Sequence, residues 1–91
     1  MVAIKATISG RVQGVWYRGW TVENAQVLGL DGWVRNRKDG TVEACFSGAE
    51  ALIQEMLSRC RSGPIAARVT SVSEEPAEKL PPAGFVQLPT A

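Results

Sequence analysis

Nine consecutive residues near the N-terminus have the types and spacing of an anion-binding loop: Gly10-Arg11-Val12-Gln13-Gly14-Val15-Trp16-Tyr17-Arg18. They follow an alternating, strand-like segment and precede a helix-like one. A strand that leads through a glycine-containing turn into a helix directs several backbone N–H groups toward one anion. Arg18 lies where the turn meets the helix and adds a guanidinium. We therefore predict a site for a small, doubly charged group such as phosphate.

The loop differs from two common phosphate-binding motifs. It lacks the Gly-Lys-Ser/Thr ending of the nucleoside-triphosphate loop. Its glycine spacing also differs from the dinucleotide fingerprint, and no acidic partner follows in a strand–helix–strand unit. Neither class of nucleotide-binding protein is indicated.

The rest of the composition restricts the chemistry. The chain has no histidine, which removes the commonest general base, the Ser-His and Cys-His nucleophile pairs and the usual zinc sites. Its two cysteines, Cys45 and Cys60, fit no zinc or CxxC spacing, and we expect reduced thiols in or near the core. An enzyme built from this chain needs a reaction that requires no such base.

The 91 residues predict one domain, 1–91, with a proline-rich tail at 76–91. A hydrophobic fraction of 45% and a charged fraction of 21% are typical of an ordinary soluble domain. No apolar run approaches the roughly 20 residues of a membrane helix, and the N-terminus lacks the apolar stretch of a signal peptide. We expect a cytoplasmic protein with no membrane association.

The charge is small but unevenly distributed. The net charge of +1 does not indicate a general nucleic-acid binder. Residues 1–40 hold six Lys/Arg and three Asp/Glu, whereas residues 41–91 hold four and six. The positive half carries the predicted anion loop, which suits an anionic ligand, although ordinary surface variation would give the same imbalance.

Hydrophobic periodicity predicts alternating strands and two helices. Strands are expected at 3–12, 32–37, 41–47 and 66–75, helices at 19–29 and 49–61, an Asp-Gly hairpin at 38–40 and a short edge strand at 85–88. The second helix has an apolar stripe of Leu52, Ile53, Met56, Leu57 and Cys60. This order predicts an α+β, ferredoxin-like β-α-β-β-α-β sandwich, with two helices on one face of a four-stranded antiparallel sheet.

The chain resembles the acylphosphatase family in more than one motif. Gly10 to Arg18 is similar to the family's phosphate-binding loop, and Gly32-Trp33-Val34-Arg35-Asn36 with Asp39-Gly40-Thr41-Val42-Glu43 is similar to its second hairpin. Further similarities lie at Thr21, Ala25, Leu28-Gly29-Leu30, Gly63-Pro64 and Ala67-Arg68-Val69. The resemblance covers roughly residues 4–75, with Phe85 as a last match. The sequence departs slightly at Tyr17, where phenylalanine is common, and at the bulky Trp16, which could reshape the mouth of the site.

The resemblance implies an enzyme that hydrolyses an acyl phosphate to a carboxylate and inorganic phosphate, without metal or cofactor. It implies that Arg18 binds the phosphoryl group and that Asn36 orients the attacking water. The phosphoryl oxygens would be held by the backbone N–H groups of Gln13, Gly14, Val15, Trp16, Tyr17 and Arg18. We expect a monomer that acts on a small molecule and has no nucleic-acid partner.

This reaction suits a chain without histidine. The leaving group is a carboxylate, which needs no general acid at neutral pH, and a loose phosphoryl-transfer transition state needs no strong base. The remaining tasks are to neutralise the phosphoryl oxygens and to place the water in line. An arginine, several amides and one asparagine can perform them.

Simpler interpretations and other functions stay open at this point. Taken singly, Arg18 could be a surface residue and Asn36 a turn-flanking one, while β-propensity explains Thr41 and packing explains Trp16, Trp20 and Trp33. The same fold could serve as a catalytically inactive phosphate- or protein-binding module. It could also be an RNA-binding module, although the strands lack an aromatic-rich pattern, or a fragment like the acylphosphatase-type domain of larger carbamoyl-transfer maturation proteins.

Overall fold

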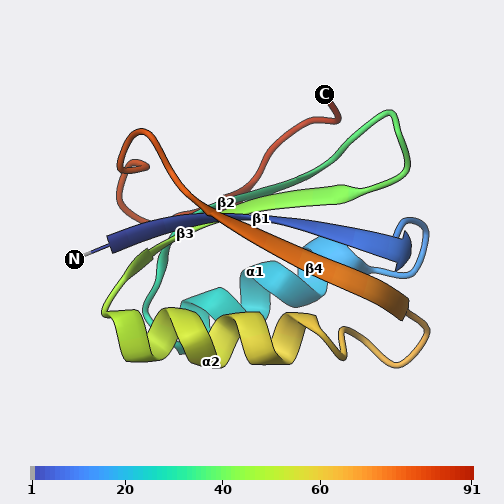
Figure 1. Ribbon diagram of the computed structural model, residues 1–91, viewed down its shortest axis with the longest axis horizontal. Helices are drawn as coiled ribbons and strands as arrows, with labels where there is room; N and C mark the ends of the chain where they lie inside the picture. The colour runs from blue at the N-terminus through green and yellow to red at the C-terminus, as the bar shows by residue number, and fades with distance from the viewer. Residues whose placement is uncertain (1) are drawn as a thin grey trace.

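The computed structural model describes residues 2–91, which form a two-layer α+β structure. Its elements are β1 (Val2–Arg11), α1 (Tyr17–Val27), β2 (Asp31–Asn36), β3 (Val42–Gly48), α2 (Glu50–Cys60), β4 (Arg68–Pro76) and β5 (Phe85–Gln87). Both helices lie on one face of the sheet (Figure 1). The ferredoxin-like arrangement predicted from the element order is confirmed.

The sheet itself differs from the prediction of four antiparallel strands. It has five strands in the order β4-β1-β3-β2-β5, and the short edge strand β5 runs parallel to β2. The other neighbours are antiparallel. The sheet is therefore mixed, because the chain leaves β4 at one edge and rejoins the sheet at the opposite edge.

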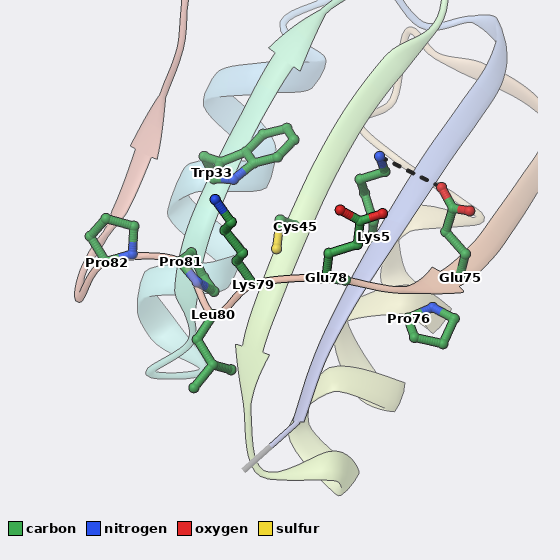
Figure 2. Close-up of a pocket in the computed structure, with 11 residues that line it drawn as sticks. Lys5, Trp33, Cys45, Glu75, Pro76, Glu78, Lys79, Leu80, Pro81 and Pro82 are labelled. Atoms are coloured by element: carbon green, nitrogen blue, oxygen red, sulfur yellow. Dashed lines mark ion pairs between the residues drawn. The ribbon is translucent and has the colours of Figure 1, made fainter.

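Residues 77–84, which we call the strap, make this crossing. Four strand spacings of about 4.8 Å give a width of about 19 Å, which eight extended residues can span at about 3.3 Å each. The strap is hydrogen-bonded at its ends, from the Ala77 N–H to the Ala3 carbonyl and from the Gly84 N–H to Asp31 Oδ1. It crosses the sheet face that the helices leave uncovered (Figure 2).

The core lies between the sheet and the helices. Alternate strand residues face it, as the period of two requires, and Ala6, Ile8, Val34, Val42, Ala44 and Phe46 are all at most 1% exposed. In α2 the predicted stripe is buried except for Leu52, which is 39% exposed and lies at the edge of the stripe. In α1 the buried residues are Tyr17, Thr21 and Ala25, while Val22 and Leu28 are only partly buried.

Both cysteines are buried free thiols, as expected. Burial raises the pKa of the Cys60 thiol to about 12 and also raises the pKa of Cys45. Neither is a thiolate at neutral pH, so neither is an effective nucleophile. Neither helix in the described part of the chain is long and apolar enough to cross a membrane.

Candidate active site

The loop of residues 12–16 connects β1 to α1 and determines how the helix begins. Gly14 and Trp16 have left-handed backbones, with φ of 74° and 66°. Trp16 occupies the N-cap position, but its side chain makes no capping hydrogen bond. No acidic residue follows in the first turn of the helix. The positive end of the α1 dipole is therefore neither capped nor neutralised by the chain itself.

The backbone amides of this segment are free to bind a ligand. Among residues 2–91, the N–H groups of residues 13–19 have no hydrogen-bond acceptor, and the first paired amide is that of Trp20, which donates to the Trp16 carbonyl at 3.0 Å. Consecutive N–H groups at a left-handed turn and a helix N-terminus form a concave anion-binding surface. The geometry has the features that the sequence predicted for this loop.

Arg18 is the second residue of α1 and is partly buried. Within the described chain its guanidinium makes no ion pair, whereas the guanidinium groups of Arg35, Arg37, Arg59 and Arg61 each contact a glutamate. An arginine without an internal carboxylate partner keeps its planar fork of donors available for a phosphate.

Asn36 is the last residue of β2, two positions after the core residue Val34. The strand period of two places both side chains on the helix-facing side of the sheet. The Asn36 Oδ1 atom is buried and has no hydrogen-bond partner in the described structure. An unsatisfied buried acceptor costs about 1–3 kcal/mol, and a bound water or ligand would satisfy it.

One cavity of about 150 Å³ brings these groups together. Arg18 and Asn36 both line it, and its remaining lining consists of Val12, Gly14, Trp16, Tyr17, Gly19 and Gln87. At about 30 Å³ per water molecule, its volume suits a phosphoryl group and one water. Arg18 and Asn36, which are 18 residues apart in the sequence, therefore line one cavity.

Two hydrogen bonds from Gln13 join the loop to the hairpin that follows Asn36. The Gln13 Nε2 atom donates to the carbonyl oxygens of Arg37 and Thr41, both at 2.8 Å. The loop and the hairpin lie at the same end of the sheet (Figure 1). The Gln13 side chain thus sets the distance between the loop amides and Asn36, while Val15 packs into the core beneath them.

Two further contacts hold the site in place. The Tyr17 hydroxyl donates to the Cys60 carbonyl at 2.6 Å, so that α1 is tied to the end of α2. Burial, followed by the interaction with Cys60, raises the Tyr17 pKa and keeps the phenol neutral. On the other side, the Ala91 N–H donates to the Asn36 carbonyl at 3.0 Å and the Ala91 carbonyl accepts from the Lys38 N–H at 2.9 Å.

The structure assigns Thr41 to the turn rather than to the cavity. Its N–H and its hydroxyl both donate to Asp39 Oδ1, at 3.0 and 2.6 Å. These hydrogen bonds lower the pKa of the Asp39 carboxyl. Thr41 contributes to the site only through its carbonyl, which accepts from Gln13.

The sequence interpretation missed Gln87 and misjudged Trp16. Gln87 lies in β5 opposite Val34, and no motif marked it because its strand is three residues long. The interpretation of Trp16 as a packing residue is wrong, because it is 60% exposed, whereas the alternative that its bulk affects the mouth of the site agrees with its place in the cavity lining. Trp20 does pack, against the core and at 5.4 Å from the Tyr17 ring.

A larger cavity of about 510 Å³ lies between the strap and the uncovered sheet face (Figure 2). Its charged groups are mixed, because Lys5 and Lys79 are accompanied by Glu75 and Glu78, and the Lys5 ammonium lies 3.6 Å from a Glu75 carboxylate oxygen. No helix begins among the residues that line it, so it lacks the positive end of a helix dipole. A doubly charged anion is therefore better matched by the smaller cavity.

Comparison with known proteins identifies relatives over the whole length of the chain. The family model described as acylphosphatase matches residues 4–87. An acylphosphatase from Rhodospirillum rubrum is 56% identical over 90 residues, covering 99% of this chain and 99% of the relative. One from Rhizorhabdus wittichii is 51% identical over 89 residues, covering 98% and 90%. The crystal structure of acylphosphatase from Bacillus subtilis matches with a TM-score of 0.91 at 31% identity, covering 97% of this chain and 99% of that chain.

Proposed function

Because this chain belongs to the acylphosphatase family and hydrolyses acyl phosphates, we propose that Arg18 and the amides of residues 13–18 bind the phosphoryl group while Asn36 positions the attacking water. The substrate is a small-molecule acyl phosphate, and the products are a carboxylate and inorganic phosphate. One observation carries the assignment of residues: Gly14, Trp16, Tyr17 and Arg18 line a single cavity together with Asn36, whereas Gln13 and Val15 do not line it.

Phosphoryl binding is supported by complementary charge and geometry. The free N–H groups donate to the non-bridging oxygens, and the Arg18 fork adds two parallel donors. These groups are fixed by the helix and the Gln13 hydrogen bonds before the substrate binds. Such preorganised donors stabilise charge that develops in the transition state without any cost of reorganisation.

Water positioning is supported by the buried Asn36 oxygen. Because an amide oxygen is a hydrogen-bond acceptor, it can accept a hydrogen bond from the water. This hydrogen bond orients the water so that a lone pair of the water oxygen points toward phosphorus. The side chain projects from the end of a paired strand, and the hydrogen bond from Ala91 holds its backbone. In-line attack then requires little bonding to the water and no strong base.

The first test concerns Arg18. We expect the Arg18→Ala variant to lose about 10³–10⁵-fold in turnover of benzoyl phosphate, since arginine contacts to transferring phosphoryl groups have effects of this size. Inhibition by inorganic phosphate should weaken as well. Arg61→Ala is a matched control because that side chain is 53% exposed and does not line the cavity. Equal activity in both variants would exclude a role of Arg18 in binding the phosphoryl group.

The second test separates water positioning from phosphate binding. In Asn36→Ala, turnover should fall by about 10²-fold or more, as for a misplaced reactant, while the inhibition constant for inorganic phosphate stays near the wild-type value. Asn24→Ala is the control, because the Asn24 side chain bonds to Trp20 and Arg59 outside the cavity. Retained turnover in Asn36→Ala would exclude the proposed role.

The structure also supports proposals on oligomeric state, cellular compartment and nucleic-acid binding. All the roles proposed here fall on residues of one chain, so this mechanism requires no second copy and a monomer would suffice. The two free thiols support a reducing compartment such as the cytoplasm. The strap covers part of the face that a related RNA-binding sheet would expose, which supports function without nucleic acid.

A further inference from the structure

Among the described residues, Trp16 is the one exposed large hydrophobic residue that lines the candidate active site. It is 60% exposed, lines the cavity beside Arg18 and Asn36, and has the left-handed φ of 66° that L-residues rarely adopt. We propose that its indole binds the acyl half of the substrate, so that the enzyme favours aromatic acyl phosphates over small aliphatic ones. This inference rests on the proposed phosphoryl site.

The indole has a defined position against α1. A Cβ atom at Gly19 would overlap the Nε1 atom of Trp16 and approach Cε2 to 2.7 Å. The ring therefore lies over the place where any larger residue at position 19 would project. A large aromatic ring held in this way loses little further conformational freedom when a ligand packs on it.

The size of the cavity places the acyl group at its rim. The cavity of about 150 Å³ is open to solvent, and the proposed site already places the phosphoryl group and a water in it. We therefore expect the acyl half to extend toward the opening, against the residues that border it. Among residues 2–91, the other exposed large apolar side chains do not line this cavity: Val2, Val27, Leu52, Ile65, Leu80 and Val86.

The expected size of the effect follows from aromatic packing. An offset-stacked or edge-to-face ring pair changes an equilibrium by about two- to tenfold beyond its buried area. An acetyl group is too small to gain this contact. Loss of the indole should therefore alter the ratio of kcat/KM for benzoyl phosphate to that for acetyl phosphate, mainly through KM for benzoyl phosphate.

The test compares three variants on these two substrates. Trp16→Gly removes the ring and suits the left-handed backbone, Trp16→Phe keeps an aromatic ring, and Trp33→Ala is a control on the opposite face of the sheet. We expect the substrate ratio to fall about three- to tenfold in Trp16→Gly, and to stay near wild type in Trp16→Phe and Trp33→Ala. Inhibition by inorganic phosphate, measured in parallel, reports on the loop amides separately from the ring.

Two results would overturn the inference: an unchanged substrate ratio in Trp16→Gly, or an equal loss on both substrates. Failure of the proposed site itself would be recognised separately, because Arg18→Ala would then keep its activity. If Arg18→Ala is inactive and Trp16→Gly retains the wild-type ratio, only the acyl-binding role of Trp16 is excluded.

Discussion

At the residue scale, the site depends on backbone conformations as much as on side chains. Arg18 and Asn36 could be selected from the sequence because they occupy positions marked by the resemblance to the acylphosphatase family. The left-handed backbone of Trp16 could not be predicted, since φ above zero is expected for glycine and not for a bulky aromatic residue. The exposure of its ring depends on the packing of α1, which local sequence does not determine.

Gly14 provides a test of the backbone contribution. Its φ is 74°, and a Cβ atom added there would have no neighbour within 4 Å, while the residue lines the cavity. We expect Gly14→Ala to lose about 1–2 kcal/mol of stability from the left-handed strain. Its Cβ would also project beside the phosphoryl position, so phosphate affinity measured by product inhibition should fall about tenfold.

Gly29 is a closely matched control. Its φ is 70°, and it has equally open space, but it lies after the C-terminus of α1 and does not line the cavity. Gly29→Ala should lose similar stability in thermal unfolding and retain phosphate affinity. Equal phosphate affinity in the two variants would show that the Gly14 position contributes strain only.

At the element scale, the order of helices and strands was predictable because the periodicities are strong. The alternation of Val42, Ala44 and Phe46 and the apolar stripe of α2 match the buried faces. Periodicity failed at β5, because three residues are too few to establish an alternation and parallel pairing depends on the path of the strap. Gln87 was missed for the same reason.

The hydrogen bonds of Gln13 between loop and hairpin predict that this side chain affects both stability and activity, although it does not line the cavity. Gln13→Ala removes two hydrogen bonds of 2.8 Å, and it should cost about 2 kcal/mol at about 1 kcal/mol each. Because the loop then moves relative to Asn36, kcat/KM should fall by about 10²-fold for a displacement near 1 Å. Thermal unfolding and steady-state kinetics measure the two effects.

Gln26→Ala is the corresponding control. Its side-chain amide donates to the Phe85 carbonyl at 3.5 Å, which is a weak hydrogen bond away from the cavity. We expect nearly wild-type kinetics and little change in unfolding temperature. Should Gln13→Ala behave like Gln26→Ala, the side chain would have no positioning role.

At the scale of the whole molecule, a charged cluster on the uncovered sheet face connects three strands. The carboxylate of Glu43 on β3 lies 2.7 Å from Arg35, 3.0 Å from Arg37 and 3.6 Å from Lys5, and Glu43 is only 2% exposed. Burial alone would raise its pKa, but the hydrogen bond from Arg35 and the charges of Arg35, Arg37 and Lys5 lower it below 4.5. This cluster could not be predicted from local sequence, because it depends on the strand register.

The lowered pKa sets the direction of a pH effect. A carboxyl group whose pKa is lower in the folded state stabilises the fold above its unfolded pKa, and this contribution is lost as the pH falls through the folded value. We expect Glu43→Gln to reduce the free energy of unfolding by about 1–3 kcal/mol at pH 7. The difference in the free energy of unfolding between Glu43→Gln and wild type should narrow below pH 4.5.

Denaturant unfolding at several pH values measures this difference. Glu23→Gln is the control, because Glu23 is exposed and makes no ion pair within residues 2–91. That variant should follow the wild-type profile. A gap between Glu43→Gln and wild type that stays constant from neutral to acidic pH would contradict the assigned electrostatic role.

The two outer strands of the sheet have a further consequence. One border is the three-residue β5, and the other is β4, which presents Arg68, Glu74 and Glu75 and ends at Pro76. The shortness of β5, and the charges and the proline of β4, discourage backbone pairing with a second molecule. These features disfavour edge-to-edge pairing between folded molecules.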